Sequence, residues 1–237
     1  MKEKPSHSTK DLIMDAAERL FATHGFEATS LRVITGEAGV NLGAVNYHFA
    51  TKDDLIVAVL MRRMGPINEK RLALLGGFET AAGNKPAPVE QILEAMFRPV
   101  LELLTCSSCE GGRSFLRLLG QVLAEPGIYL VPLIKEQFAE KMARFTAALG
   151  RALPGLSEQE IYWKFHFATG AFVHTVARSQ ILELTSHGKC RLSDVDDTLA
   201  RIIPFCAAGF QAAGKTNAIR ARRTPVRFRK STQSILK

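Results

Sequence analysis

The chain has 237 residues, of which 46% are hydrophobic and 23% are charged. This is the composition of a globular protein with a sizeable buried core, and it excludes a mainly disordered chain. The sequence contains no apolar run long enough to cross a bilayer, and its polar beginning does not resemble a secretory signal. We therefore expect a cytoplasmic protein with no role in a membrane.

The net charge of +8 is confined to one end of the chain. Residues 1–214 contain 23 basic and 23 acidic residues, whereas residues 215–237 contain 8 basic residues and no acidic one. The high charge is therefore a property of a tail. We predict that this tail is disordered and either acts as a flexible polycation that raises nonspecific affinity for DNA or serves solubility alone.

Apolar residues recur at helical spacing along the body of the chain, and no alternating strand pattern competes. We therefore predict an all-α protein. Capping residues, glycines and prolines divide it, in chain order, into helices over residues 9–24, 30–38, 42–49, 52–64, 66–81, 89–104, 114–125, 132–153, 161–184 and 194–213.

Prolines and capping pairs set several of these predicted boundaries. We expect Gly65–Pro66 to end one helix, and Pro99 to kink another, because proline removes a backbone hydrogen bond. The capping pairs are Thr51 with Asp54, Ser157 with Glu160, and Ser193 with Asp196.

The first 60 residues hold the most informative pattern. A helix is followed by two short helices that a turn at Gly39 separates, and a longer helix comes next. This order is typical of a helix-turn-helix, in which the second short helix enters the major groove of DNA. Helical spacing predicts that Val45 and Phe49 face inward on that second helix.

The remaining side chains of the second short helix suit contact with DNA. Small residues at Gly43 and Ala44 allow close approach to base edges, and Asn46 can pair with adenine. Tyr47 and His48 can reach phosphates. With the preceding helix start and the next lysine included, the predicted DNA-contacting residues are Ser30, Arg32, Asn41, Leu42, Gly43, Ala44, Asn46, Tyr47, His48 and Lys52.

A specific run closes this region: Tyr47-His48-Phe49-Ala50-Thr51-Lys52-Asp53-Asp54-Leu55. It joins the recognition helix, a capping threonine and a phosphate-facing lysine. Together with residues 30–40, it resembles the DNA-binding domain of TetR-family transcriptional regulators. The resemblance implies a homodimer, a palindromic double-stranded DNA operator, and a helical domain whose small ligand controls DNA affinity.

This resemblance divides the chain into a helix-turn-helix domain over residues 8–53, a ligand-binding and dimerisation domain over 54–214, and the basic tail. Residues 40–49 look like the fatty-acid-responsive PsrA branch of the family. The effector expected first is therefore a long-chain fatty acid or acyl-CoA that releases a repressor from its operator. The alternative is a regulator of efflux or detoxification genes that responds to aromatic or drug-like molecules.

The second domain is rich in phenylalanine, because ten of the fourteen phenylalanines lie between Phe78 and Phe210. These side chains could line an apolar tunnel for an effector, or simply fill the core. The candidate ligand-binding residues are Phe97, Phe115, Phe138, Met142, Phe145, Trp163 and His166. Small residues in the last two helices allow close approach, and the resemblance implies that these helices pair with their symmetry mates.

Two other classes of protein remain possible. Cys106 and Cys109 have the spacing of a redox or metal motif, although no strand or further ligand pattern supports either chemistry. A helical interaction module without DNA function is the other alternative. The sequence shows no catalytic motif, so we expect no enzyme, no catalytic residue, no metal and no cofactor.

Overall fold

The computed structural model describes residues 8–105, 115, 118, 139–192 and 194–212. Within these ranges every regular element is an α-helix, which confirms the all-α prediction. The same helices include none that is both long and apolar enough to span a membrane.

Three helices form a compact N-terminal unit: α1 (Thr9–His24), α2 (Leu31–Ala38) and α3 (Leu42–His48). Phe21, Ile34 and Val45 come from the three helices in turn and are fully buried. The starts of the helices follow the sequence, because Ser8, Ser30 and Asn41 each accept a hydrogen bond from a backbone N–H of the first turn.

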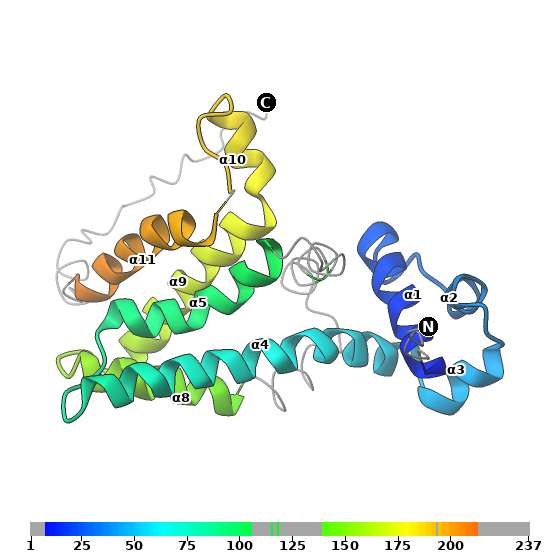
Figure 1. Ribbon diagram of the computed structural model, residues 1–237, viewed down its shortest axis with the longest axis horizontal. Helices are drawn as coiled ribbons and strands as arrows, with labels where there is room; N and C mark the ends of the chain where they lie inside the picture. The colour runs from blue at the N-terminus through cyan, green and yellow to red at the C-terminus, as the bar shows by residue number, and fades with distance from the viewer. Residues whose placement is uncertain (1–7, 106–114, 116–117, 119–138, 193, 213–237) are drawn as a thin grey trace, which may run out of the picture.

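The helix that follows is longer than predicted. α4 (Lys52–Ala82) continues through Pro66, so the predicted end at Gly65–Pro66 is wrong. A proline inside a helix costs about 3 kcal/mol. Burial of Met64 and Ile67 on either side of it offsets this cost, because both pack in the core. Figure 1 shows α4 extending from the N-terminal unit along the C-terminal helices.

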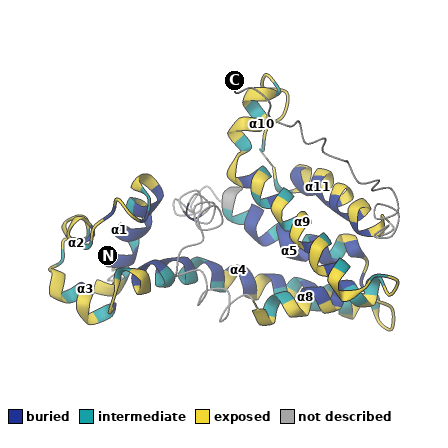
Figure 2. Ribbon diagram, turned by 180° about the vertical axis from the view of Figure 1, so that it is seen from behind, coloured by how far each residue is buried: buried dark blue, intermediate teal, exposed yellow. Residues whose placement is uncertain are grey.

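The C-terminal helices pack in layers beside the second half of α4. They are α5 (Val89–Thr105), α8 (Ala139–Ala152), α9 (Glu158–Ala177), α10 (Ser179–Thr185) and α11 (Val195–Gln211). α5 is the central member, since it contacts α4, α8 and α11, and Figure 2 shows it as mostly buried. The rings of Phe97 in α5 and Phe172 in α9 stack with centroids 4.3 Å apart.

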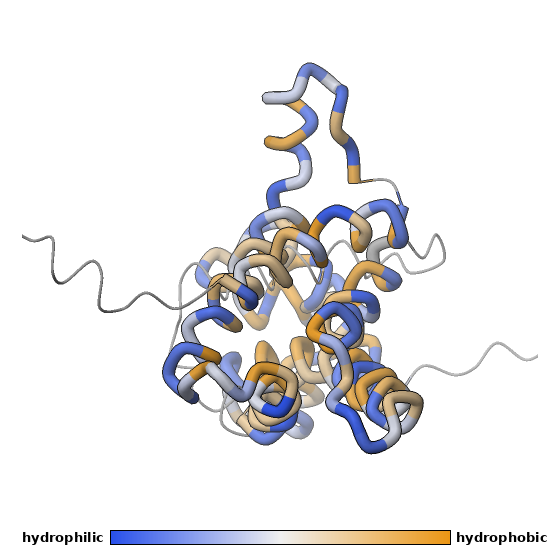
Figure 3. Tube along the Cα trace, turned by 90° about the vertical axis from the view of Figure 1, so that its left-hand side faces the viewer, coloured by the Kyte–Doolittle hydropathy of each residue, from blue (hydrophilic) through white to orange (hydrophobic). Residues whose placement is uncertain are grey.

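Two boundaries in this region differ from the sequence predictions. The expected helix over 161–184 is two helices, because Arg178 leaves the helical conformation and α10 turns away from α9. α10 projects beyond the other helices in Figures 1 and 3. The cap of α11 is Asp194, whose carboxylate accepts two backbone N–H bonds, whereas the predicted cap, Ser193, lies outside the described residues. The expected helix over 114–125 also falls almost wholly outside them.

Charged side chains fasten the two ends of α4. Glu79, near its C-terminal end, pairs with Arg144 and Arg151 of α8. The hydrogen bond from Arg144, with its positive charge, holds the pKa of Glu79 below the usual value for a glutamate. The second half of α4 is thereby tied to the C-terminal helices.

The first half of α4 is tied to α1 by a buried carboxylate. Glu18 is only 2% exposed, and it accepts hydrogen bonds from Arg62 at 2.6 Å and from Arg63 at 3.0 Å. Arg62 also donates to Asp15 at 2.7 Å. We name Asp15, Glu18, Arg62 and Arg63 the α1–α4 clamp. It fixes the angle between the N-terminal unit and the long helix.

We expect Glu18→Ala to lower the free energy of unfolding by about 2–3 kcal/mol, because it leaves two arginines without their shared, buried acceptor. Urea unfolding measures this change. The matched control is Glu37→Ala, which removes the exposed pair with Arg19 and should cost less than about 1 kcal/mol. Equal losses for the two variants would contradict a special role for the clamp.

Candidate DNA-binding and ligand-binding sites

Most side chains of α3 are exposed or only partly buried. Tyr47 is 85% exposed and Leu42 is 40% exposed, whereas Val45 is fully buried, as the sequence predicts. Gly43 and Asn46 are also exposed, and Ala44 and His48 are partly buried. Figure 2 shows α3 as largely exposed, at the end of the molecule remote from the C-terminal helices.

Local hydrogen bonds hold α3 in this position. Gly39 takes the left-handed conformation, with φ at 65°, and ends α2. Asn41 then accepts a hydrogen bond from the Ala44 N–H at 2.8 Å, and the Phe49 ring anchors the other end in the core. The turn and both caps are therefore set within eleven residues of sequence, from Gly39 to Phe49.

The remaining predicted DNA contacts flank α3. Ser30 and Arg32 are exposed at the start of α2, and Lys52 is the first residue of α4. The Lys52 ammonium donates to the Glu27 carbonyl at 3.5 Å. All ten predicted residues thus belong to the start of α2, to α3 with its N-cap, and to the start of α4.

One cation near α3 was not predicted from the sequence. The Lys10 ammonium lies 5.9 Å from the centre of the Phe49 ring. The Lys10 side chain therefore reaches from α1 to the end of α3. Only the folded arrangement brings these positions together, since they are far apart in the chain. Lys10 therefore joins Arg32 and Lys52 as a candidate phosphate contact.

The predicted ligand-binding residues fall into two groups. Phe97, Phe115 and Phe145 lie in the hydrophobic core with at most 1% exposure. Met142, Trp163 and His166 line a cavity of about 810 Å³ between α8 and α9. The remaining candidate, Phe138, lies outside the described residues. The cavity is lined by Met142, Thr146, Glu158, Gln159, Tyr162, Trp163, Phe165, His166 and Thr169.

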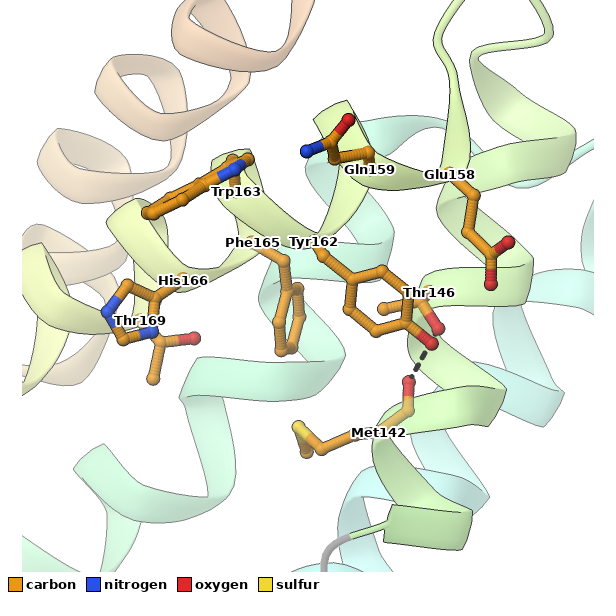
Figure 4. Close-up of a pocket in the computed structure, with 9 residues that line it drawn as sticks. All are labelled: Met142, Thr146, Glu158, Gln159, Tyr162, Trp163, Phe165, His166 and Thr169. Carbon is orange, nitrogen blue, oxygen red and sulfur yellow. Dashed lines mark hydrogen bonds between the residues drawn. The ribbon is translucent and has the colours of Figure 1, made fainter.

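The lining of this cavity is mainly apolar and aromatic (Figure 4). Trp163 and His166 approach edge to face, with ring centres 6.5 Å apart. The Thr146 hydroxyl donates to the Met142 carbonyl, whereas the Thr169 hydroxyl is buried without a hydrogen-bond partner. Such a cavity can hold a flat or elongated apolar molecule with one polar group.

The outer face of α9 and α11 is apolar and uncovered. Trp163, Phe167 and Phe205 are 56%, 63% and 70% exposed. Gly170, Ala208 and Gly209 lie exposed on the same helices, whereas Ala168 and Ala207 point into the core. We name the exposed residues of this set the α9–α11 face. A group of exposed apolar side chains on neighbouring helices is typical of a protein interface.

The cysteines that the structure describes do not form a reactive pair. Cys190 is exposed, and Cys206 is buried among apolar side chains, which raises the pKa of its thiol. Cys106 and Cys109 lie outside the described residues. Among the residues that are described, no cluster of histidine, cysteine, aspartate or glutamate could hold a metal ion.

Fold and site together define a class of protein. A helix-turn-helix unit with an exposed recognition helix is joined, through one long helix, to a separate helical domain with an apolar cavity. This is the organisation of a DNA-binding transcriptional regulator.

Comparison with known families identifies the class further. The family model described as bacterial regulatory proteins, tetR family, matches residues 13–59. The model described as tetracyclin repressor-like, C-terminal domain, matches residues 94–209. The chain belongs to the TetR family of transcriptional regulators.

Curated relatives match this chain over short stretches. The transcriptional repressor Rv3405c of Mycobacterium tuberculosis is 52% identical over 48 residues, which are 20% of this chain and 26% of that protein. The repressor AcnR of Corynebacterium glutamicum is 35% identical over 57 residues, or 24% of this chain and 30% of that protein. The chain thus matches less than a third of the length of either relative.

Solved structures are similar over most of the chain. The fatty acid degradation regulator FadR of Bacillus halodurans has a TM-score of 0.61 at 17% identity, covering 88% of this chain and 98% of that one. FadR of Bacillus subtilis, in complex with stearoyl-CoA, has a TM-score of 0.57 at 18% identity, with 84% and 97% covered. A complex of SmeT with triclosan has a TM-score of 0.60 at 22% identity, with 85% and 91% covered. These similarities establish the fold.

Proposed function

We propose that the protein is a homodimeric repressor that binds a palindromic operator and is released from it by a small apolar ligand. In this proposal the two α3 helices enter successive major grooves, about 34–36 Å apart. The observation that carries the proposal is α3 itself, whose Val45 is buried on one side while Tyr47 and Asn46 are exposed on the other. Such a regulator acts on the chromosome, in the cytoplasm.

The ten predicted contacts divide by chemistry. Gly43, Ala44 and Asn46 are assigned to base edges, where the methyl group of Ala44 suits that of a thymine, and Leu42 lies beside them on the outward side of α3. Ser30, Arg32, Asn41, Tyr47, His48 and Lys52 are assigned to the phosphate backbone. Few of these are cationic, so we propose that the folded body binds DNA with a shallow salt dependence and that the basic tail adds nonspecific affinity.

A long-chain fatty acid or acyl-CoA is the first effector class that we propose. Two regulators of similar fold are named FadR, one of them solved with stearoyl-CoA. The likeness of residues 40–49 to the PsrA branch favours the same chemistry. An acyl chain needs an elongated apolar space, which the phenylalanine-rich helices of this domain can supply.

An aromatic or drug-like effector is the second candidate. It is favoured by the cavity between α8 and α9, where Tyr162, Trp163 and His166 present three aromatic rings. SmeT, which shares the fold, was solved with triclosan. A flat aromatic molecule would stack on these rings, and the unpartnered Thr169 hydroxyl would bond its polar group.

The direct experiment is fluorescence anisotropy of the purified protein with DNA from the region upstream of its own gene. We expect tight, sequence-dependent binding that an acyl or aromatic effector reverses. Release by only one of the two classes identifies the effector. Absence of sequence-dependent binding to this DNA and to a set of genomic fragments would contradict the repressor function.

Replacing Tyr47 tests the interface with DNA. We expect Tyr47→Ala to weaken operator binding at least tenfold in the same assay, because the side chain is free to contact DNA. The free energy of unfolding should change by less than about 0.5 kcal/mol, since Tyr47 is 85% exposed. Leu184→Ala, at an exposed leucine of α10, is the control and should bind DNA normally. Unchanged binding by Tyr47→Ala would remove α3 from the interface.

Replacing Phe205 tests the homodimer. We propose that the α9–α11 face pairs with its counterpart in a second copy, so Phe205→Glu should place a charge in the interface and shift the protein to monomer. Sedimentation velocity measures this, and operator affinity should fall with it. Val33→Glu replaces an exposed apolar side chain of α2 and should remain dimeric. A dimeric Phe205→Glu variant would exclude this face.

A further inference from the structure

A buried cation lies between α4 and α5, in the domain proposed to bind the effector. Arg71 is 7% exposed, and its guanidinium donates to the Met96 carbonyl at 2.8 Å and to the Asn68 side-chain carbonyl at 3.2 Å. Both acceptors are neutral. Among the residues that the structure describes, no carboxylate is paired with Arg71.

Burial disfavours the charged form of this side chain. Burial alone lowers the pKa of Arg71 to about 10. The guanidinium still carries its charge at neutral pH, and a buried charge without a counter-ion is strongly unfavourable. Ion pairs elsewhere in the chain avoid this cost, as with Arg62 and Glu18.

Asn68, one turn earlier on the same helix, also has a buried polar group that lacks a partner. It is 1% exposed, and its Nδ2 amide group is buried without an acceptor, although its carbonyl oxygen is occupied by Arg71. A buried donor without a partner costs about 1–3 kcal/mol. An unsatisfied amide N–H therefore lies beside a buried guanidinium that has no counter-ion, and an anionic oxygen acceptor would satisfy the first and neutralise the second.

We propose that Arg71 and Asn68 form the receptor for the carboxylate of a free fatty acid effector. The inference rests on the proposed function, in that it assumes an effector in this domain, and it assigns that effector a charged head group. A forked guanidinium and an amide can bond both oxygens of a carboxylate. An acyl-CoA thioester lacks this carboxylate, so the receptor favours the free acid.

Space for the acyl chain lies along the same stretch of α4, in a cavity whose lining does not include Arg71 or Asn68. This cavity of about 570 Å³ runs along α4 and reaches α5; Lys70, Ala73, Leu74, Gly77, Phe78 and Glu102 line it. Leu74 and Phe78 follow Arg71 by three and seven residues, so they lie on its side of the helix. An acyl chain on this surface would extend toward the end of α4 that α8 holds.

The position on α4 also gives the carboxylate a route to the DNA-binding unit. Arg71 links α4 to α5 through the Met96 carbonyl, and an incoming carboxylate competes for that guanidinium. Because α4 is continuous to Lys52 and clamped to α1, a change in its packing against α5 is transmitted to α3. The ligand would shift the equilibrium only as far as it binds the two arrangements differently.

Titration calorimetry on the full chain tests the proposal with three probes: decanoate, the neutral decanol and decanoyl-CoA. We expect decanoate to bind at least tenfold more tightly than decanol or the thioester. Arg71→Met should lose at least tenfold in decanoate affinity, while Lys85→Met, at an exposed lysine in the turn after α4, should keep it. Equal affinity for decanoate and decanol, or tighter binding of the thioester, would overturn the proposal.

Asn68→Asp is the sharper variant, because it supplies a carboxylate beside Arg71 from the chain itself. We expect it to raise the melting temperature of the ligand-free protein and to abolish the response to decanoate. A lower melting temperature with an unchanged decanoate response would show that the pair is only structural, and it would overturn the assignment. The melting temperature and decanoate response of Asn68→Asp also test the assignment of the carboxylate receptor if Arg71→Met fails to fold.

Operator binding, measured separately by anisotropy, keeps the two proposals apart. Carboxylate-dependent binding without any DNA binding would refute the repressor function and leave the receptor standing. Specific DNA binding with no preference for decanoate would refute the receptor and leave the repressor function standing.

Discussion

The arrangement of the molecule depends on one helix that takes part in both of its domains. The first half of α4 packs against the N-terminal unit, where Arg62 and Arg63 bind the buried carboxylate of Glu18. It ends against α5 and α8, where Glu79 is paired with arginines. The partners at both ends are charged and directional, so they fix an orientation as well as a contact, which apolar packing alone does less strictly. These contacts therefore hold α4 both to α1 and to the C-terminal helices.

The sequence predicted the parts of the structure that depend on local chemistry. Ser8, Asn41 and Thr51 cap the helices that follow them, and the spacing of Val45 and Phe49 identified the buried side of α3. These features depend on hydrogen bonds and periodicity within a few residues, so a single sequence contains them. The same local patterns, with the motif that follows α3, were sufficient to indicate the family.

The features that sequence reasoning missed depend on residues far apart in the chain. Local sequence rules predict a helix end at Pro66, whereas α4 continues through it. Whether a helix can include a proline depends on the burial of the residues around it, which a single sequence does not show. The clamp joins positions more than forty residues apart, and a buried Arg71 contradicts the usual exposure of arginine. The predicted ligand-binding residues include both core and cavity positions for the same reason. Helical spacing cannot distinguish a core phenylalanine such as Phe97 from one beside a cavity.

Pro66 gives the long helix a point of weakness between its two attachments. Proline lacks the N–H that would bond the carbonyl of Arg62, so the helix is softest just beyond the clamp. From Pro66 to the start of α4 is about 21 Å, at 1.5 Å per residue. Bending there by about 10° displaces the far end of this lever by roughly 4 Å, comparable to the rise of one base pair, about 3.4 Å. In the repressor that we propose, a small rearrangement of the C-terminal helices would therefore be amplified into a mismatch with the spacing of DNA half-sites.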